Sequence, residues 1–284
     1  MARISATHRF SDPPKWQSGL LIRQTPPMPI VSVLSHKGGV GKTSVVLGLA
    51  GAAMQQGLAT LVVDLDPQGN ASSILGPESP TASALDLFSR PGSKALHDAV
   101  TACAWESGPG EVDVVVSDPM LIKFDAWKEI GSITPRLTKS LEHSAGYDLV
   151  LIDCPPSLGT LAVEALAASD AALIVTEPTY FGVQGALRAA DTFEEVKKHL
   201  NRKLKDVSVI LNRVKSTADE HDYRAKELSR EFGKLVVKPT IPERIAVQQA
   251  EGAAIAVQKY GSAGSREISN IFETHLDKLL RRIG

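Results

Sequence analysis

The sequence contains few cysteines and almost no net charge. Only Cys103 and Cys154 occur among its 284 residues, and they are far apart and form no CxxC pair. This argues against a disulfide framework or a zinc site, and it fits a reducing cytoplasm. The formal net charge is −1, so the overall charge balance indicates no particular partner.

Long apolar runs are also missing. No run approaches the roughly 18 apolar residues that a membrane-spanning helix needs. Residues 1–28 are polar, proline-rich and basic, without the apolar core of a secretion signal. We therefore predict a flexible N-terminal tail over 1–28 and one folded domain over 29–284.

From Ile30 onward, short β-branched runs alternate with longer helical stretches, which predicts an α/β fold. The sheet is expected to be doubly wound and mostly parallel, with helices on both faces. Residues 76–110 are rich in Pro, Gly and Ser and are expected to be the loosest part. The predicted strands are 30–34, 60–65, 112–117, 147–153, 171–176 and 207–212, and the predicted helices are approximately 42–56, 132–144, 160–168, 183–199, 219–231 and 264–282.

Residues 35–44, SHKGGVGKTS, lie between the first strand and the first helix. Gly41, Lys42 and Thr43 match the second half of the phosphate-loop pattern GxxxxGK[ST]. His36 stands where that pattern has its first glycine. Gly38 and Gly39 are expected to bring backbone N–H groups close to phosphate oxygens, and the helix N-terminus adds its positive dipole.

The second half of the loop also predicts the contacts to a nucleotide and its metal. Lys42 is expected to neutralise the β- and γ-phosphate oxygens, and the Thr43 hydroxyl to hold Mg²⁺. Two carboxylates, Asp64 and Asp66, are two residues apart at a strand end, so both can face this loop. Asp153 ends another strand, as a magnesium-binding aspartate of this class of site does.

The segment KGGVGKTS resembles the deviant phosphate loop of the ParA/MinD family of partitioning and positioning ATPases. The resemblance runs from about residue 29 to the C-terminus and is strongest to the Soj-like ParA proteins. Four further segments carry it, at 62–72, 147–159, 176–186 and 241–252.

The resemblance implies ATP and Mg²⁺ as ligands and assigns roles to the loop. The additional lysine, Lys37, would reach across a homodimer to the ATP of the other subunit. Asp66 would orient the attacking water, with Asp64 close to the Mg²⁺ shell and Asp153 binding Mg²⁺ through water. The implied phosphate contacts are Lys37, Gly38, Gly39, Val40, Gly41, Lys42, Thr43 and Ser44.

The same resemblance implies an adenine pocket near the end of the last strand. Asn212 follows the run VSVIL, and its amide offers a donor and an acceptor to the adenine edge. Pro242 and Glu243 fall where the family closes the base pocket.

A basic segment lies in the C-terminal third. Residues 197–244 hold 13 Lys and Arg against 7 Asp and Glu, a surplus of 6 (13 − 7). Such a local surface suits weak, sequence-independent binding to double-stranded DNA. The candidate contacts are Lys203, Lys205, Arg224, Lys234, Lys238 and Arg266.

Together with these features, the resemblance to ParA implies a nucleoid-associated, cytoplasmic ATPase that a ParB-like partner stimulates to hydrolyse ATP and release DNA. A competing hypothesis is a MinD-like, membrane-associated regulator of division, because residues 271–283 are amphipathic. We favour a core-packing helix there. The sequence is also compatible with a ParA-like ATPase that positions another cargo and with an ATP-sensing scaffold that binds no DNA.

Overall fold

The computed structural model describes residues 28–106, 108–126, 128–144 and 146–284. Of the predicted tail, all but Met28 lies outside the described residues.

Seven strands form one sheet in the order β3-β4-β2-β5-β1-β6-β7. All neighbouring strands are parallel except β3, which pairs antiparallel with β4 at one edge. The predicted mostly parallel α/β sheet is therefore confirmed. The strands are β1 (Ile30–Leu34), β2 (Ala59–Asp64), β3 (Val100–Ala102), β4 (Glu111–Val115), β5 (Leu149–Asp153), β6 (Ala171–Thr176) and β7 (Asp206–Leu211).

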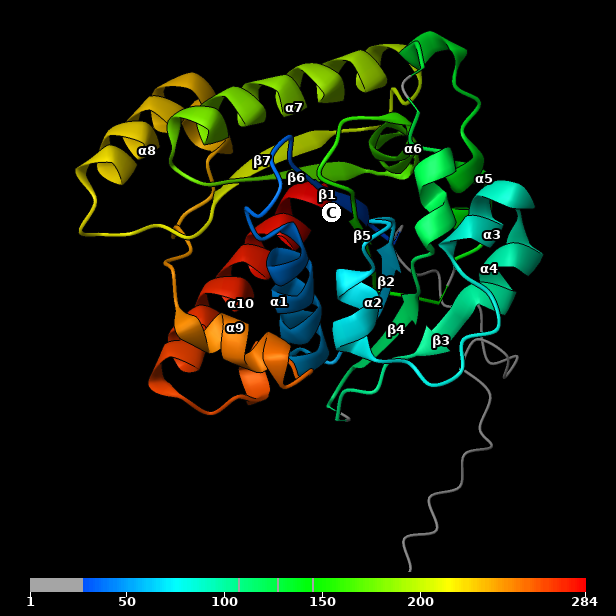
Figure 1. The fold of residues 1–284 in the computed structure, drawn as a ribbon, viewed down its shortest axis with the longest axis horizontal. Helices are drawn as coiled ribbons and strands as arrows, with labels where there is room; N and C mark the ends of the chain where they lie inside the picture. The colour runs from blue at the N-terminus through cyan, green and yellow to red at the C-terminus, as the bar shows by residue number, and fades with distance from the viewer. Residues whose placement is uncertain (1–27, 107, 127, 145) are drawn as a thin grey trace, which may run out of the picture.

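Helices cover both faces of the sheet (Figure 1), and each face has its own apolar core. On one face lie α1 (Lys42–Gln55), α2 (Asn70–Leu75), α9 (Ile245–Gly252) and α10 (Ala263–Ile283). On the other lie α3 (Ala84–Ser89), α4 (Ser93–Ala99), α5 (Arg136–Leu141), α6 (Thr160–Ala168), α7 (Tyr180–His199) and α8 (Asp219–Phe232). The short 3-10 helices are η2 (Pro119–Lys123), η3 (Ile130–Ser132), η4 (Gly233–Leu235) and η5 (Val257–Lys259).

The expectation that residues 76–110 are loose is wrong. This stretch contains α3, α4 and β3. Ser83 begins α3 with a capping box, in which its hydroxyl accepts from a backbone N–H while Asp86 accepts from the Ser83 N–H. Leu87 and Phe88 are buried in the apolar core on the α3 side of the sheet. Their burial offsets the backbone conformational entropy that this segment loses on folding.

Two further helices, α2 and α9, were not predicted, and the helix expected over 132–144 is shorter. It spans only Arg136–Leu141, and Pro135 precedes it. The conformation that a proline imposes on the residue before it disfavours helix at Thr134.

The C-terminal helix α10 packs against α1, as favoured. Ile268, Phe272 and Leu276 are buried. A Cβ at Gly48 of α1 would lie 2.2 Å from the Phe272 ring, so the glycine allows the two helices to approach closely. The apolar face that a membrane would need is thus occupied by the core, and no helix in the described part of the chain is long and apolar enough to cross a bilayer.

His275 of α10 is also buried, and its ring makes one hydrogen bond to the described residues. Nε2 donates to the Pro239 carbonyl at 2.7 Å, whereas Nδ1 is buried and has no partner in the described ranges of the chain. Burial lowers the pKa of His275, and the charge of Lys278 lowers it further. The folded chain therefore favours the neutral imidazole.

We expect the free energy of unfolding to fall as the pH drops through about 6.5, because the unfolded chain then binds a proton that folded His275 refuses. His275→Gln retains an N–H donor for the Pro239 carbonyl and should flatten this pH dependence. Urea denaturation at a series of pH values measures it, with the exposed His143→Gln as control. Identical pH profiles for wild type and His275→Gln would contradict the expectation.

Candidate functional site

The loop from Ser35 to Gly41 joins β1 to α1 at the carboxyl edge of the sheet. Gly39 and Gly41 have φ angles of 79° and 83°, which favour glycine. A Cβ at Gly41 would also lie 2.3 Å from Asn212 Nδ2. Gly41 is the N-cap of α1 and supplies no side chain. The N–H groups of the first helical turn are therefore available to an anion.

Lys42 lies at the start of α1, and its residue is only 6% exposed. Its ammonium has no hydrogen-bond acceptor or ion-pair partner among the described residues. Its positive charge is nevertheless close enough to lower the pKa of Asp153 by electrostatic attraction. A buried cation needs an anionic partner. The loop and Lys42 together therefore fit the phosphate groups of a nucleotide.

Asp153 ends β5 and is 1% exposed. Its Oδ2 accepts a hydrogen bond from Thr43 Oγ1 at 2.7 Å, while Oδ1 is buried without a partner among the residues that the structure describes. Burial, followed by the charge of Asp64, raises the pKa of Asp153 to about 8. An unpaired, buried carboxylate oxygen beside a threonine hydroxyl fits Mg²⁺, which completes its shell with water and phosphate oxygens.

Asp64 ends β2 and stands opposite Asp153 in the parallel register. Its Oδ1 accepts from the Asp66 N–H at 3.1 Å, and its Oδ2 accepts from the Ser72 N–H and hydroxyl at 2.8 and 2.7 Å. Burial raises the pKa of Asp64 to about 6. Both oxygens thus already hold the turn and the start of α2, and contact with a metal stays a prediction.

Asp66 lies two residues beyond the end of β2 and is buried. One carboxylate oxygen, Oδ1, accepts from the Gln68 N–H at 3.0 Å. Its backbone carbonyl accepts from Ser117 Oγ at 2.5 Å, and Ser117 N–H in turn donates to Ser72 Oγ. Oδ2 accepts no hydrogen bond from the described residues, so this oxygen can bind a water.

The Lys37 side chain is paired with a residue outside the phosphate loop. Its Nζ lies 3.1 Å from Glu177 Oε2, just beyond the end of β6, and its side chain is 36% exposed. Glu177 Oε1 also lies 3.6 Å from Arg213 Nη1. This ion pair keeps Lys37 at the surface beside the phosphate loop.

The predicted base-binding residues come together. Asn212, Pro242, Glu243 and Ser44 line one small pocket. Asn212 Nδ2 donates to the Val40 carbonyl at 2.8 Å, so its amide also secures the phosphate loop. Ser44 Oγ donates to Glu251 Oε1 of α9 at 2.5 Å, and its contact with a phosphate stays a prediction.

Four further residues of the site had no role predicted from the sequence, although three of them, Ser72, Glu177 and Glu251, lie in segments that carry the family resemblance. Ser72, Ser117, Glu177 and Glu251 reach the site from separate elements, and common polar residues in turns and helices do not indicate such contacts. Only the position of Glu177 directly after a predicted strand could have marked it.

The basic candidates do not all lie at the same edge of the sheet. Lys203 and Lys205 precede β7, at the amino ends of the strands. Arg224 lies at the opposite edge, with its guanidinium 5.2 Å from the Tyr180 ring centroid and bonded to Glu220 and Glu227 at 2.7 and 2.8 Å.

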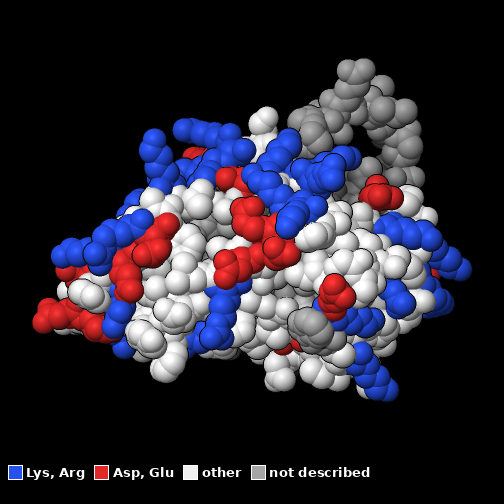
Figure 2. Space-filling model, turned by 90° about the horizontal axis from the view of Figure 1, so that it is seen from above, with Lys and Arg blue, Asp and Glu red and all other residues white. Residues whose placement is uncertain are grey.

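The remaining three basic candidates lie on further elements. Lys234 is in η4, Lys238 follows it and Arg266 is on α10, where it donates to the Gly261 carbonyl. On the face seen in Figure 2, Lys and Arg side chains are interspersed with Asp and Glu.

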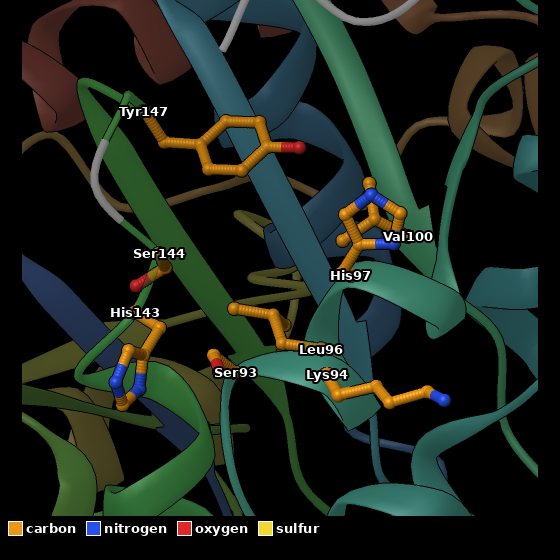
Figure 3. A pocket seen from close by; sticks show the side chains of 8 residues that line it. All are labelled: Ser93, Lys94, Leu96, His97, Val100, His143, Ser144 and Tyr147. Carbon is orange, nitrogen blue, oxygen red and sulfur yellow. The ribbon is translucent and has the colours of Figure 1, made fainter. Parts of the chain in front are cut away.

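A cavity of about 380 Å³ lies away from the phosphate loop, between α4 and the segment before β5 (Figure 3). Leu96, Val100 and the Tyr147 ring form its apolar part. The Tyr147 hydroxyl donates to Asp113 Oδ2 at 2.6 Å, and the Ser144 hydroxyl donates to the Leu141 carbonyl. The Tyr147 and Ser144 hydroxyls are thus already engaged, and Ser93, Lys94, His97 and His143 supply the other polar side chains of the lining.

Comparison with known protein structures supports the fold. The chain superimposes on a McdA variant of Cyanothece in complex with ATP, with a TM-score of 0.77, 24% identity, and 90% of this chain and 98% of that chain covered. For MinD of Pyrococcus furiosus the TM-score is 0.67 at 25% identity, with 89% of this chain and 99% of that chain covered. For cobyrinic acid a,c-diamide synthase of Mycobacterium smegmatis with bound ADP and magnesium, the TM-score is 0.70 at 22% identity, with 89% of this chain and 94% of that chain covered.

Sequence comparison identifies the family. Residues 28–206 match the family described as AAA domain. The sporulation initiation inhibitor protein Soj of Bacillus subtilis is 32% identical over 227 residues, which cover 78% of this chain and 87% of that protein. The chromosome partitioning protein ParA of Myxococcus xanthus is 32% identical over 225 residues, covering 78% and 77%. With its deviant phosphate loop, this chain therefore belongs to the ParA/Soj family of P-loop ATPases.

Proposed function

We propose that this protein is a partitioning ATPase that binds Mg·ATP, pairs into a homodimer around two nucleotides and then binds DNA without sequence preference. The observation that carries the proposal is the pair of lysines in one loop. Lys42 is buried at the helix N-terminus without an acceptor among the described residues, whereas the Lys37 side chain is half-exposed and forms an ion pair with Glu177. Membership of the ParA/Soj family supports this interpretation.

Each side chain has a distinct proposed task. The loop N–H groups and Lys42 bind the β- and γ-phosphates, and Asn212, Pro242 and Glu243 bind the adenine. Thr43 and Asp153 hold Mg²⁺, which supplies charge neutralisation at the phosphate oxygens. Asp66 uses its free Oδ2 to orient the attacking water, because phosphoryl transfer depends mainly on positioning and charge stabilisation. A ParB-like partner stimulates this step and so releases the dimer from the nucleoid.

Lys37→Ala is expected to bind ATP but to remain monomeric, because its cation serves the nucleotide of the other subunit. Sedimentation velocity with a nonhydrolysable ATP analogue measures the association. The matched control is Lys226→Ala, which removes another lysine paired with a carboxylate and should dimerise normally. Lys42→Ala should lose nucleotide binding altogether. A dimer formed by Lys37→Ala as readily as by wild type would refute the proposed crossing contact.

Asp66→Ala is expected to bind ATP and accumulate as a dimer, with turnover reduced about 100-fold or more through loss of water positioning. Phosphate release at saturating Mg·ATP, together with sedimentation, measures both properties. Asp118→Ala, which removes an aspartate that caps η2, is the control. Normal turnover by Asp66→Ala would rule out the proposed role.

The DNA interaction is expected to need ATP and to weaken steeply with salt. Each phosphate contact contributes about 0.9 to the slope of log affinity against log salt, and a dimer doubles the number of contacts. Fluorescence anisotropy with duplexes of unrelated sequence, with and without the nonhydrolysable analogue, measures this salt-dependent binding.

Binding to anionic liposomes tests the membrane hypothesis. ATP-dependent lipid binding without DNA binding would favour a MinD-like regulator, and binding to neither would favour the scaffold.

A further inference from the structure

The loop that follows Asp153, residues 154–159, contacts the phosphate loop. The Cys154 N–H donates to the Val33 carbonyl of β1 at 3.2 Å. Pro156 lies against Gly38, where an added Cβ would be 3.8 Å from Pro156 Cβ. This first part of the loop is thereby connected to the phosphate site.

The far end of the same loop is held by Asp125, which lies between η2 and η3. Asp125 Oδ2 accepts from Ser157 Oγ at 2.6 Å, and Oδ1 accepts from the Leu161 N–H at 3.1 Å. The next residue adds a further contact, because the Thr160 hydroxyl donates to the Ala126 carbonyl.

The contact between Asp125 and the start of α6 leaves no room for a side chain at residue 159. A Cβ at Gly159 would lie 2.5 Å from Asp125 Oδ1 and 2.7 Å from the Asp125 carbonyl oxygen. Gly159 is the N-cap of α6 and makes no side-chain cap hydrogen bond. Asp125 therefore caps α6 from a distant part of the chain, and its negative charge suits the helix N-terminus.

From this geometry we infer that Asp125 is a positioning residue for ATP hydrolysis. It touches no reacting group. It fixes residues 157–161, and through them the loop that begins at Asp153 and packs on Gly38. The inference rests on the proposed ATPase function. Without Asp125 the loop is expected to sample more conformations, and misplaced groups slow a reaction that depends on positioning.

Asp125→Ala should keep ATP affinity near that of wild type and lower turnover about tenfold. Hydrogen exchange of the Leu161 amide should accelerate in the ATP-free protein. Asp125→Asn should recover most of the turnover, because its amide oxygen can accept from the Leu161 N–H and its amide nitrogen can donate to Ser157 Oγ. Asp118→Ala is the matched control, since its carboxylate caps η2 by accepting from the Met120 N–H.

The unfolding midpoints of Asp125→Ala and Asp118→Ala should agree. A loss of turnover in Asp125→Ala alone then reports loop positioning and not general destabilisation. Ser157→Ala provides a milder second variant and should lower turnover less than Asp125→Ala. Unchanged turnover in both variants, or an Asp125→Asn as slow as Asp125→Ala, would overturn the inference. A wild-type protein that hydrolyses no ATP would instead refute the proposed function, while the Leu161 exchange would still report on the contact itself.

Discussion

The site depends on a concentration of buried charge at one edge of the sheet. Asp64 and Asp153 stand side by side at the carboxyl ends of β2 and β5, with Asp66 just beyond and Lys42 at the facing helix end. Burial raises the pKa values of the Asp64 and Asp153 carboxyls, and the neighbouring carboxylates raise them further. The surrounding structure offsets this through three hydrogen bonds to Asp64 and through Thr43 and Lys42 near Asp153.

The compensation is incomplete at the atoms where ligands are proposed to bind. Within the described part of the chain, Asp153 Oδ1 has no partner and Lys42 has no acceptor. A nucleotide phosphate with its metal would satisfy the carboxylate and the ammonium at once. Because unpaired buried charge destabilises the fold, ligand binding and local stability are expected to be coupled at this edge.

The loops around this charge are held from two sides. On the β6 side, Glu177 pairs with Lys37, and on the α6 side, Asp125 holds the loop after Asp153. Both contacts join segments that are distant in sequence.

The amino-acid sequence by itself determined the parallel α/β order, the phosphate loop and the placement of Asp64, Asp66 and Asp153 at strand ends. Strand periodicity and glycine requirements are local properties, so residues 35–44 and the predicted strands could be recognised directly. The tertiary structure alone decided the order in residues 76–110, the separation of the basic candidates and the partners Glu177 and Asp125. These outcomes depend on which segments meet after folding, and short-range sequence pattern does not encode contacts between segments that are far apart along the chain.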